Sequence, residues 1–297
     1  MNIPTYCTNC ETTEGVRFQC KGCNFAKFCS RDCQKKCWKK HKRHCMPLTD
    51  AVNNSIEKAR SFLKNENRID DKESHCMFCL EGGTSEDPLF HSGCGCRPDS
   101  GMSIGHIKCF QEFARASFAD EKKREDSFHC CVGKCSNCSQ DRNGIIPFEM
   151  LLVLSKLYDP DCLTRKNVQG IDNKRALFMR NSLLCLDFAL NEIDFDSAHQ
   201  DFILYCRLRI LYLIKSVFKQ IQCNEYDRIH QEIQEDVDIG KILIGIKKYQ
   251  AAIDFNRRNY EKYLLNINEH PVLKCLSHRV HYTYAQSLFV AFQVSKQ

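Results

Sequence analysis

Long hydrophobic runs are missing from this sequence of 297 residues. The most apolar stretch, 202–214, is interrupted by Arg207 and Arg209, so it is too polar to cross a bilayer. The first residues of the chain contain no apolar segment of the kind found in secretory signal peptides. We therefore expect a soluble, intracellular protein of the cytoplasm or nucleus, with no membrane partner.

Cysteine, by contrast, is abundant and unevenly placed. Of 22 cysteines, 17 lie before residue 139, most of them in closely spaced pairs. In a chain without a signal peptide, such pairs indicate metal ligands in a reducing compartment rather than disulfides. The N-terminal half is thus predicted to be built around metal, and the C-terminal half to have an ordinary apolar core.

The stretch 7–45 holds eight cysteines and two histidines but almost no side chains for an apolar core. Its ligands form four pairs, enough for two tetrahedral zinc sites. Gly22 lies in a Cys-x2-Cys knuckle, where the backbone turns sharply, and an x3 spacing places two ligands on one face of a helix. We expect knuckles and short strands first, then a helix. The pairs are Cys7 with Cys10, Cys20 with Cys23, Cys29 with Cys33, and His41 with Cys45.

Several residues of this stretch carry a resemblance to a known family. They are the run from Phe28 to Gln34, then Trp38, His41, Lys42 and Cys45. They are similar to the C-terminal half of a MYND zinc finger, whose ligand pairs interleave. The resemblance implies one zinc on Cys7, Cys10, Cys29 and Cys33, and a second on Cys20, Cys23, His41 and Cys45. MYND fingers bind short proline-containing peptides, and the resemblance maps their contact positions to Gln34 and Trp38, beside Phe28.

The predicted metal-binding helix carries two further features. Trp38, the only tryptophan of the chain, has a second interpretation as packing that locks this helix, and both roles are compatible. The helix is also strongly basic. Its cations are Lys35, Lys36, Lys39, Lys40, Lys42 and Arg43. We interpret them as a solvated face rather than a nucleic-acid contact, because nothing in the run is suited to reading bases.

Residues 46–74 are predicted to be a linker with one amphipathic helix. Asn54 or Ser55 is its candidate N-cap. The apolar positions that recur at helical spacing are Ile56, Ala59, Phe62 and Leu63. The helix is expected to end in the polar run 65–74.

Residues 75–140 contain four more ligand pairs in a glycine-rich stretch. Such a segment buries little apolar area, whereas a structural zinc contributes about 10–16 kcal/mol of coupled binding and folding. The pairs are Cys76 with Cys79, Cys94 with Cys96, His106 with Cys109, and Cys135 with Cys138. Cys131 is an alternative to either member of the last pair, although only Cys135 and Cys138 have knuckle spacing.

This second cluster resembles a RING-CH finger, the RING variant with cysteine as fourth and histidine as fifth ligand. The family's cross-brace implies one zinc on Cys76, Cys79, His106 and Cys109, and another on Cys94, Cys96, Cys135 and Cys138. In ubiquitin ligases of this family an apolar groove holds the conjugating enzyme, and the matching positions are Phe78 and Phe113. The other interpretation of these two rings is a miniature core between the metal loops.

From about residue 141 the sequence predicts an all-helical domain. Apolar residues recur at helical spacing in five segments: 147–157, 176–190, 202–221, 239–255 and 273–292. We expect five to seven helices packed as hairpins in a solenoid-like order. The segment 248–271 faintly resembles a single tetratricopeptide repeat.

The predicted fold is a tandem of small zinc-stabilised α+β modules followed by an all-α domain. The domains are 1–45, 46–74, 75–140 and 141–297. We favour a zinc-binding adaptor that recruits proteins, with four Zn2+ and no catalytic residue. The alternatives are a RING-type ubiquitin ligase, with a conjugating enzyme as partner, and a nucleic-acid-associated regulator.

Overall fold

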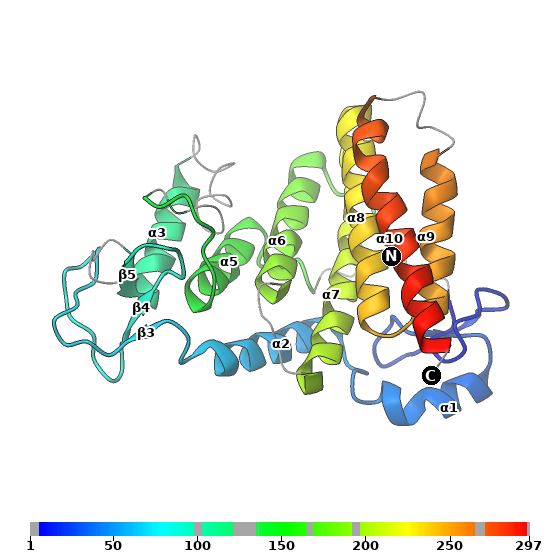
Figure 1. Ribbon diagram of the computed structural model, residues 1–297, viewed down its shortest axis with the longest axis horizontal. Helices are drawn as coiled ribbons and strands as arrows, with labels where there is room; N and C mark the ends of the chain where they lie inside the picture. Colours follow the sequence, from blue (N-terminus) through cyan, green and yellow to red (C-terminus); the bar gives the residue numbers. More distant parts are fainter. Residues whose placement is uncertain are drawn as a thin grey trace. The chain divides into compact units, whose positions relative to one another are not determined.

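The computed structural model divides the chain into two compact units (Figure 1). The described residues are 6–97, 103–120, 135, 137–164, 169–191, 197–264 and 271–295. The first unit comprises Met1–Val52, Asn167–Ala176 and Ser197–Gln297, and the second comprises Asn53–Lys166 and Leu177–Asp196. None of the helices in the described ranges combines the length and the apolar character that crossing a bilayer needs.

A two-stranded hairpin and a helix form the N-terminal part of the first unit. Strand β1 (Phe18–Gln19) pairs antiparallel with β2 (Lys27–Phe28). Helix α1 (Arg31–His41) begins after Ser30, whose side chain accepts a hydrogen bond of 3.1 Å from the backbone N–H of Cys33, as expected of an N-cap. The expectation of short strands followed by a helix is therefore confirmed.

Four helices make up most of the rest of the first unit. They are α7 (Ser197–Phe218), α8 (Glu225–Gly245), α9 (Tyr249–Leu264) and α10 (Pro271–Ser295). Helix α8 packs against the other three, and α9 packs against α10 (Figure 1). Asn224 caps α8, because its side-chain oxygen accepts a hydrogen bond of 2.8 Å from the N–H of Asp227.

The segment of helical periodicity over 239–255 belongs to two helices, because α8 ends and α9 starts inside that range. Lys247 adopts a left-handed conformation with φ 60°. Its N–H bonds to the carbonyl of Ile244 at 3.0 Å, and the N–H of Lys248 bonds to that of Leu243 at 2.9 Å. These two bonds form a Schellman motif, which terminates a helix. Glycine normally takes the left-handed position, so a lysine there gives no sequence signal.

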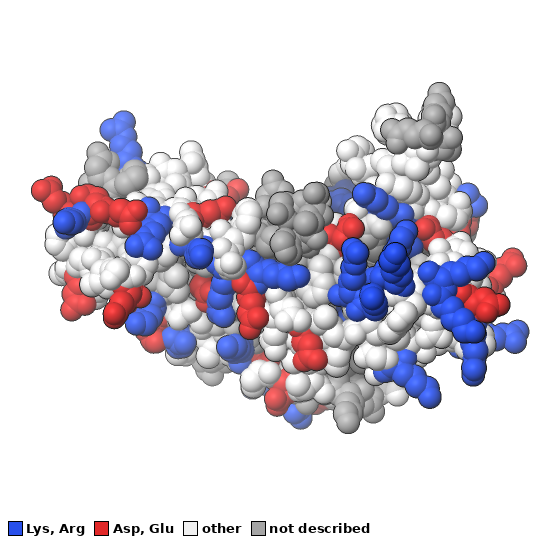
Figure 2. All heavy atoms as spheres, turned by 90° about the horizontal axis from the view of Figure 1, so that it is seen from below, with Lys and Arg blue, Asp and Glu red and all other residues white. Residues whose placement is uncertain are grey.

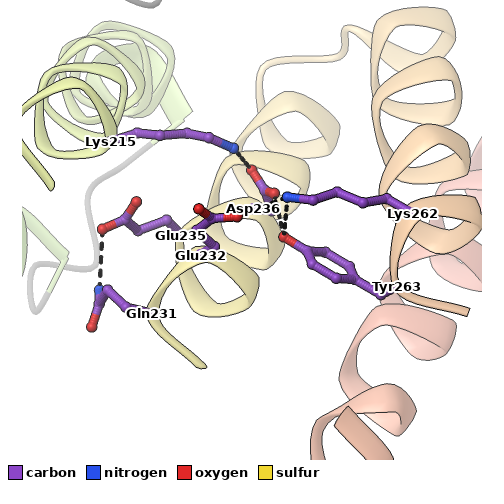
Figure 3. Close-up of polar contacts among 7 residues, drawn as sticks. All are labelled: Lys215, Gln231, Glu232, Glu235, Asp236, Lys262 and Tyr263. Carbon is purple, nitrogen blue, oxygen red and sulfur yellow. Dashed lines mark hydrogen bonds and ion pairs between the residues drawn. The ribbon is translucent and has the colours of Figure 1, made fainter. Parts of the chain in front are cut away.

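Buried polar side chains fix α7, α8 and α9 against one another (Figure 3). Lys215 of α7 pairs with the buried carboxylate of Asp236 on α8. The other oxygen of Asp236 accepts a 2.7 Å hydrogen bond from the hydroxyl of Tyr263 on α9. Burial and the nearby Asp236 raise the pKa of Tyr263, so its hydroxyl stays protonated and donates. This pairing compensates a charge that would otherwise be costly to bury.

The second unit contains a small antiparallel sheet and helices. Its strands follow the order β3 (Arg68–Ile69), β4 (Leu89–His91) and β5 (Ile104–His106). Helix α3 (Ile107–Ala119) follows β5 directly and packs against α5 (Ile145–Tyr158). Most of α2 (Leu48–Leu63) and most of α6 (Asn173–Asn191) also belong to this unit.

The amphipathic helix expected in 46–74 exists, but it starts earlier than predicted. Helix α2 begins directly after Pro47, so Asn54 and Ser55 lie inside the helix and neither caps it. Ala51 and Val52 extend the buried face toward the N-terminus. The carbonyl of Pro47 accepts a hydrogen bond of 3.0 Å from the N–H of Ala51, and proline is tolerated at a helix start because the first N–H groups have no partner within the helix.

Helix α5 is buried on nearly all sides, including the carboxylate of Glu149. Arg60 contacts Glu149 through two hydrogen bonds, of 2.5 and 3.0 Å, and Gln111 donates a third at 3.1 Å. A bidentate guanidinium pair satisfies a carboxylate that has left water. The pair joins α2 and α5 within the second unit.

Candidate metal centres and interaction groove

The structure brings together four groups of cysteine and histidine side chains. Within each group the candidate ligand atoms all lie within 4.8 Å of one another. The groups are Cys7, Cys10, Cys29 and Cys33; Cys20, Cys23, His41 and Cys45; Cys76, Cys79, His106 and Cys109; and Cys94, Cys96, Cys135 and Cys138. These are the interleaved and cross-braced sets that the sequence resemblances imply.

The first group has the dimensions of a tetrahedral sulfur site. Its Sγ atoms are 3.6 Å apart between Cys10 and Cys29, 3.4 Å between Cys29 and Cys33, and 3.8 Å between Cys10 and Cys33. Four thiolates around zinc at the usual Zn–S distance are about 3.8 Å apart. Asn9, which the sequence does not single out, donates its side-chain N–H to Cys33 at 3.5 Å and so supports the ligand set.

The second group uses one histidine nitrogen. Nε2 of His41 lies 3.3 Å from the sulfur of Cys20 and 3.8 Å from that of Cys23. The sulfurs of Cys20 and Cys45 are 3.4 Å apart. A Cβ atom at Gly22 would stand 2.8 Å from the Cys45 sulfur, so this knuckle requires glycine.

The third group uses the other histidine nitrogen. Nδ1 of His106 lies 3.4 Å from the sulfur of Cys79 and 3.9 Å from that of Cys109. Nε2 of the same ring lies 3.3 Å from the backbone carbonyl of Gly82. A proton held on Nε2 by this carbonyl leaves the lone pair of Nδ1 free for a metal, a common arrangement around zinc.

The fourth group lies between two distant parts of the second unit. The sulfurs of Cys96 and Cys135 are 3.7 Å apart. The side-chain amide of Asn137 donates to Cys96 at 3.2 Å, a contact that spacing alone does not reveal. Cys138 completes the group, whereas the alternative ligand Cys131 lies outside the described residues.

The thiols of each group influence one another strongly. Burial raises the pKa of Cys76, but the backbone N–H groups of Cys79, Phe78 and His106 outweigh burial, and the pKa falls to about 6. Burial and neighbouring thiols raise the pKa of Cys109 to about 12. All the sulfurs of such a group can ionise together only when a cation compensates their charge, as a bound zinc does.

Sulfur and imidazole ligands in closed groups of four fit zinc as a structural ion. Residues 7–45 match the family model of the MYND finger. This part of the chain is therefore a zinc-binding finger of a kind that mediates protein interactions. No curated protein and no solved structure matches the chain. The resemblance of residues 76–138 to a RING-CH finger stays a prediction.

A groove on the finger lies between the hairpin and α1. Two aromatic side chains stand exposed in it: Phe18 is 37 % and Trp38 is 49 % exposed. Its lining residues are Phe18, Gln19, Cys20, Lys21, Gly22, Arg31, Gln34, Lys35, Trp38 and Cys45. Zinc ligands therefore form part of its wall. Phe18 was not singled out in the sequence, because a two-residue strand gives no periodic pattern.

Two of the three partner-binding positions expected in the finger lie in the groove, and the third does not. Gln34 and Trp38 line the groove. Phe28 does not, because it is fully buried and its ring packs edge-on against His41 at 5.9 Å between centroids. The ring of Trp38 also packs against that of His41, with 6.0 Å between centroids, so it stabilises the metal-binding helix while staying accessible. Phe28 thus belongs to the core of the finger rather than to its contact surface.

The two aromatic residues of the second cluster lie together at its first knuckle. Phe78 and Phe113 are each 38 % exposed, with ring centroids 5.8 Å apart. Phe110 supports Phe78 edge-on at 5.0 Å. Met77 and Leu80 are exposed beside Phe78 in the sequence. The knuckle therefore presents an apolar surface rather than an enclosed core, and Leu80 is a member that sequence reasoning missed.

The MYND finger is held by α7 within the first unit. Arg209, only 5 % exposed, donates to the backbone carbonyls of Cys23 at 3.1 Å and Met46 at 3.0 Å. Its guanidinium also lies 5.8 Å from the ring centroid of Phe25. Tyr205 packs edge-on against Phe25 at 5.6 Å. The knuckle that supplies two zinc ligands is therefore fastened to the helices.

A second attachment joins the finger to the start of α9. The carboxylate of Glu11 accepts hydrogen bonds from the backbone N–H groups of Gln250 at 2.9 Å and Ala251 at 3.1 Å. Lys248 donates to the carbonyl of Thr8 at 2.7 Å. Glu11 thus acts as the N-terminal cap of a helix far away in the sequence, where a negative charge is favourable. The finger is an integral part of the unit.

Proposed function

We propose that this protein is a zinc-dependent adaptor that binds a short proline-containing segment of another protein in the groove of its MYND finger. The observation that carries the proposal is the pair of exposed aromatic side chains, Phe18 and Trp38, on a zinc-stabilised frame. Aromatic-lined grooves suit proline-rich segments, because these segments are extended before binding and lose little entropy.

The groove residues have separate parts in this function. Trp38 and Phe18 supply apolar surface for the proline rings. Gln34 offers an amide that can both donate to and accept from a peptide backbone. The candidate zinc ligands Cys33 and His41 on α1, and the contact of the finger with α7, keep these groups in place before the partner arrives. Such preorganisation lowers the entropic cost of binding.

Replacing Trp38 by alanine tests the groove. We expect Trp38→Ala to weaken binding of a proline-rich peptide by about 30-fold or more, as for a central aromatic anchor, while the zinc content stays unchanged. Calorimetric titration and elemental analysis measure the two quantities. Tyr226→Ala, which removes an exposed aromatic side chain outside the groove, should bind normally. Unchanged binding by Trp38→Ala would move the peptide site to the helices.

A second candidate function is a RING-type ubiquitin ligase. It is favoured by the apolar surface around Phe78 and Phe113 beside the third metal group. Such a ligase forms no covalent intermediate with ubiquitin. It brings a charged conjugating enzyme and a substrate together, so its effect is one of orientation and effective concentration.

The ligase function predicts ubiquitin chains in a reconstituted assay with activating enzyme, a panel of conjugating enzymes and ubiquitin. Phe78→Ala should abolish the chains, because it removes the centre of the apolar surface, and zinc should be retained. Phe289→Ala on α10, which removes another exposed phenylalanine, serves as the control. If the unmodified protein forms no chains with any enzyme of the panel, the ligase function is excluded and the adaptor is unaffected.

A further inference from the structure

The groove of the MYND finger is lined by Lys and Arg side chains but by no Asp or Glu. Three of its lining residues are cationic, namely Lys21, Arg31 and Lys35, and none is acidic. Asp32, in the first turn of α1, does not line the groove. Figure 2 shows Lys and Arg side chains gathered over α1, with fewer Asp and Glu side chains among them. An apolar floor thus has a basic rim.

These three cations are available to a partner. All three are exposed. Among the residues that the structure describes, none of them is paired with a carboxylate, and Arg31 lies over the Phe18 ring at 6.0 Å. Other basic residues of the first unit are engaged: Lys215 pairs with Asp236, and Arg209 with backbone carbonyls. No carboxylate of the described residues therefore pairs with the rim, and the zinc site in the groove wall, with three thiolates and one neutral imidazole, offsets only one of the three positive charges.

We infer that the groove selects an acidic peptide, in which carboxylates flank the apolar and proline residues. This inference rests on the proposed function and names the partner's chemistry. The apolar residues contact Phe18 and Trp38, and the carboxylates lie along the rim formed by Lys21, Arg31 and Lys35. A single exposed ion pair contributes little, so selectivity requires two or three carboxylates together. Complementary charge acts mainly on specificity and on the association rate.

Single-stranded nucleic acid is the competing ligand, because it also binds surfaces of aromatic and basic side chains. The ring geometry favours the peptide. Base stacking needs open aromatic faces. Arg31 lies over one face of Phe18 at 6.0 Å, and Trp38 is in tilted contact with His41 at 6.0 Å, so part of each ring surface is already occupied. The edges and partly exposed surfaces that remain suit aliphatic and proline side chains.

The fluorescence of Trp38 provides the test, since it is the only tryptophan and lies in the groove. The full zinc-loaded chain is titrated with a synthetic peptide that has a proline-rich core flanked by glutamates, and with a second peptide in which glutamines replace the glutamates. We expect the glutamate peptide to bind about tenfold more tightly at low salt, with a difference that shrinks as salt screens the charges.

Charge reversal locates the effect. Lys21→Glu with Lys35→Glu should remove the preference for glutamate, since both repel the flanking carboxylates. Lys36→Glu with Lys40→Glu changes the charge of the same finger by the same amount at exposed positions outside the groove, and should keep most of the preference. Zinc analysis of both double variants shows whether the finger is intact.

The possible results separate the two proposals. Equal affinity for the two peptides overturns the acidic selectivity and leaves peptide binding standing. If neither peptide changes the Trp38 emission or binds by calorimetry, the groove function and the selectivity fail together. An oligouridine that displaces the glutamate peptide and binds more tightly than it does would assign the groove to nucleic acid instead.

Discussion

Removal of zinc is expected to unfold the metal-built parts of both units. Elemental analysis of the reduced native protein should find four zinc ions per chain, one for each ligand group. Structural zinc contributes about 10–16 kcal/mol of coupled binding and folding, more than the total stability of most domains. A strong chelator should therefore abolish the part of the cooperative unfolding transition that belongs to these metal-built parts. Circular dichroism and calorimetry before and after chelation measure this loss.

Substituting one ligand at a time measures how much each zinc site contributes to this stability. Cys20→Ser should lower the zinc content by one ion and reduce the melting temperature sharply, because it opens the second site at its buried knuckle. Cys223→Ser removes an exposed thiol that belongs to none of the four groups, so it should retain all four ions. A metal-free protein that melts like the native one would refute zinc as the determinant of the fold.

Loss of zinc from the finger should also destabilise the helices of the first unit. Glu11, which caps α9, lies just after the ligand Cys10, and Arg209 binds the carbonyl of the ligand Cys23. When the knuckles lose their metal, these attachment points lose their fixed geometry. The N-terminus of α9 then loses a charge-assisted cap. Metal binding and helix packing are thus parts of one stabilising system.

The ligand groups could be predicted from the sequence because coordination imposes local spacing. Two ligands three or four positions apart must meet at one ion, so Cys7 with Cys10 and His41 with Cys45 are visible as pairs. The helices of the C-terminal half were visible for a similar reason, since apolar periodicity is a local property. The limits of α8 were not visible, because Lys247 takes a backbone conformation that a glycine usually signals.

The orientation of individual side chains and their contacts with residues far away in the sequence could not be predicted in the same way. Phe28 stands next to a ligand, but a two-residue strand does not show which of its side chains points inward, and Phe28 proved to be buried. Arg209 interrupts an apolar run, and the sequence alone indicated only that this run is too polar to cross a bilayer. Arg209 is buried, because the carbonyls that satisfy it come from residues 163 and 186 positions away in the sequence. Spacing carries no information about such partners.

Substitution of Arg209 by alanine is the second large expected effect. The carbonyls of Cys23 and Met46 would lose their donor, and the contact with Phe25 would be lost with them. Hydrogen bonds to charged groups contribute about 1.5–3 kcal/mol each, so Arg209→Ala should lower the free energy of unfolding of the first unit by about 3–5 kcal/mol. Urea unfolding measures this change. Faster transfer of zinc to a chromogenic chelator should accompany it, because Cys23 holds its ion in the loosened knuckle.

Two variants distinguish attachment from a general effect of removing an arginine. Arg209→Lys keeps the charge but cannot reach both carbonyls with a planar fork, so its loss should lie between those of alanine and the native residue. Arg228→Ala removes an exposed arginine from α8, whose pair with Glu225 at 3.7 Å is too exposed to contribute much. If Arg209→Ala unfolds and releases zinc like Arg228→Ala, α7 does not hold the finger through Arg209. A selective loss in Arg209→Ala means that α7 helps to build the frame from which the finger presents its groove.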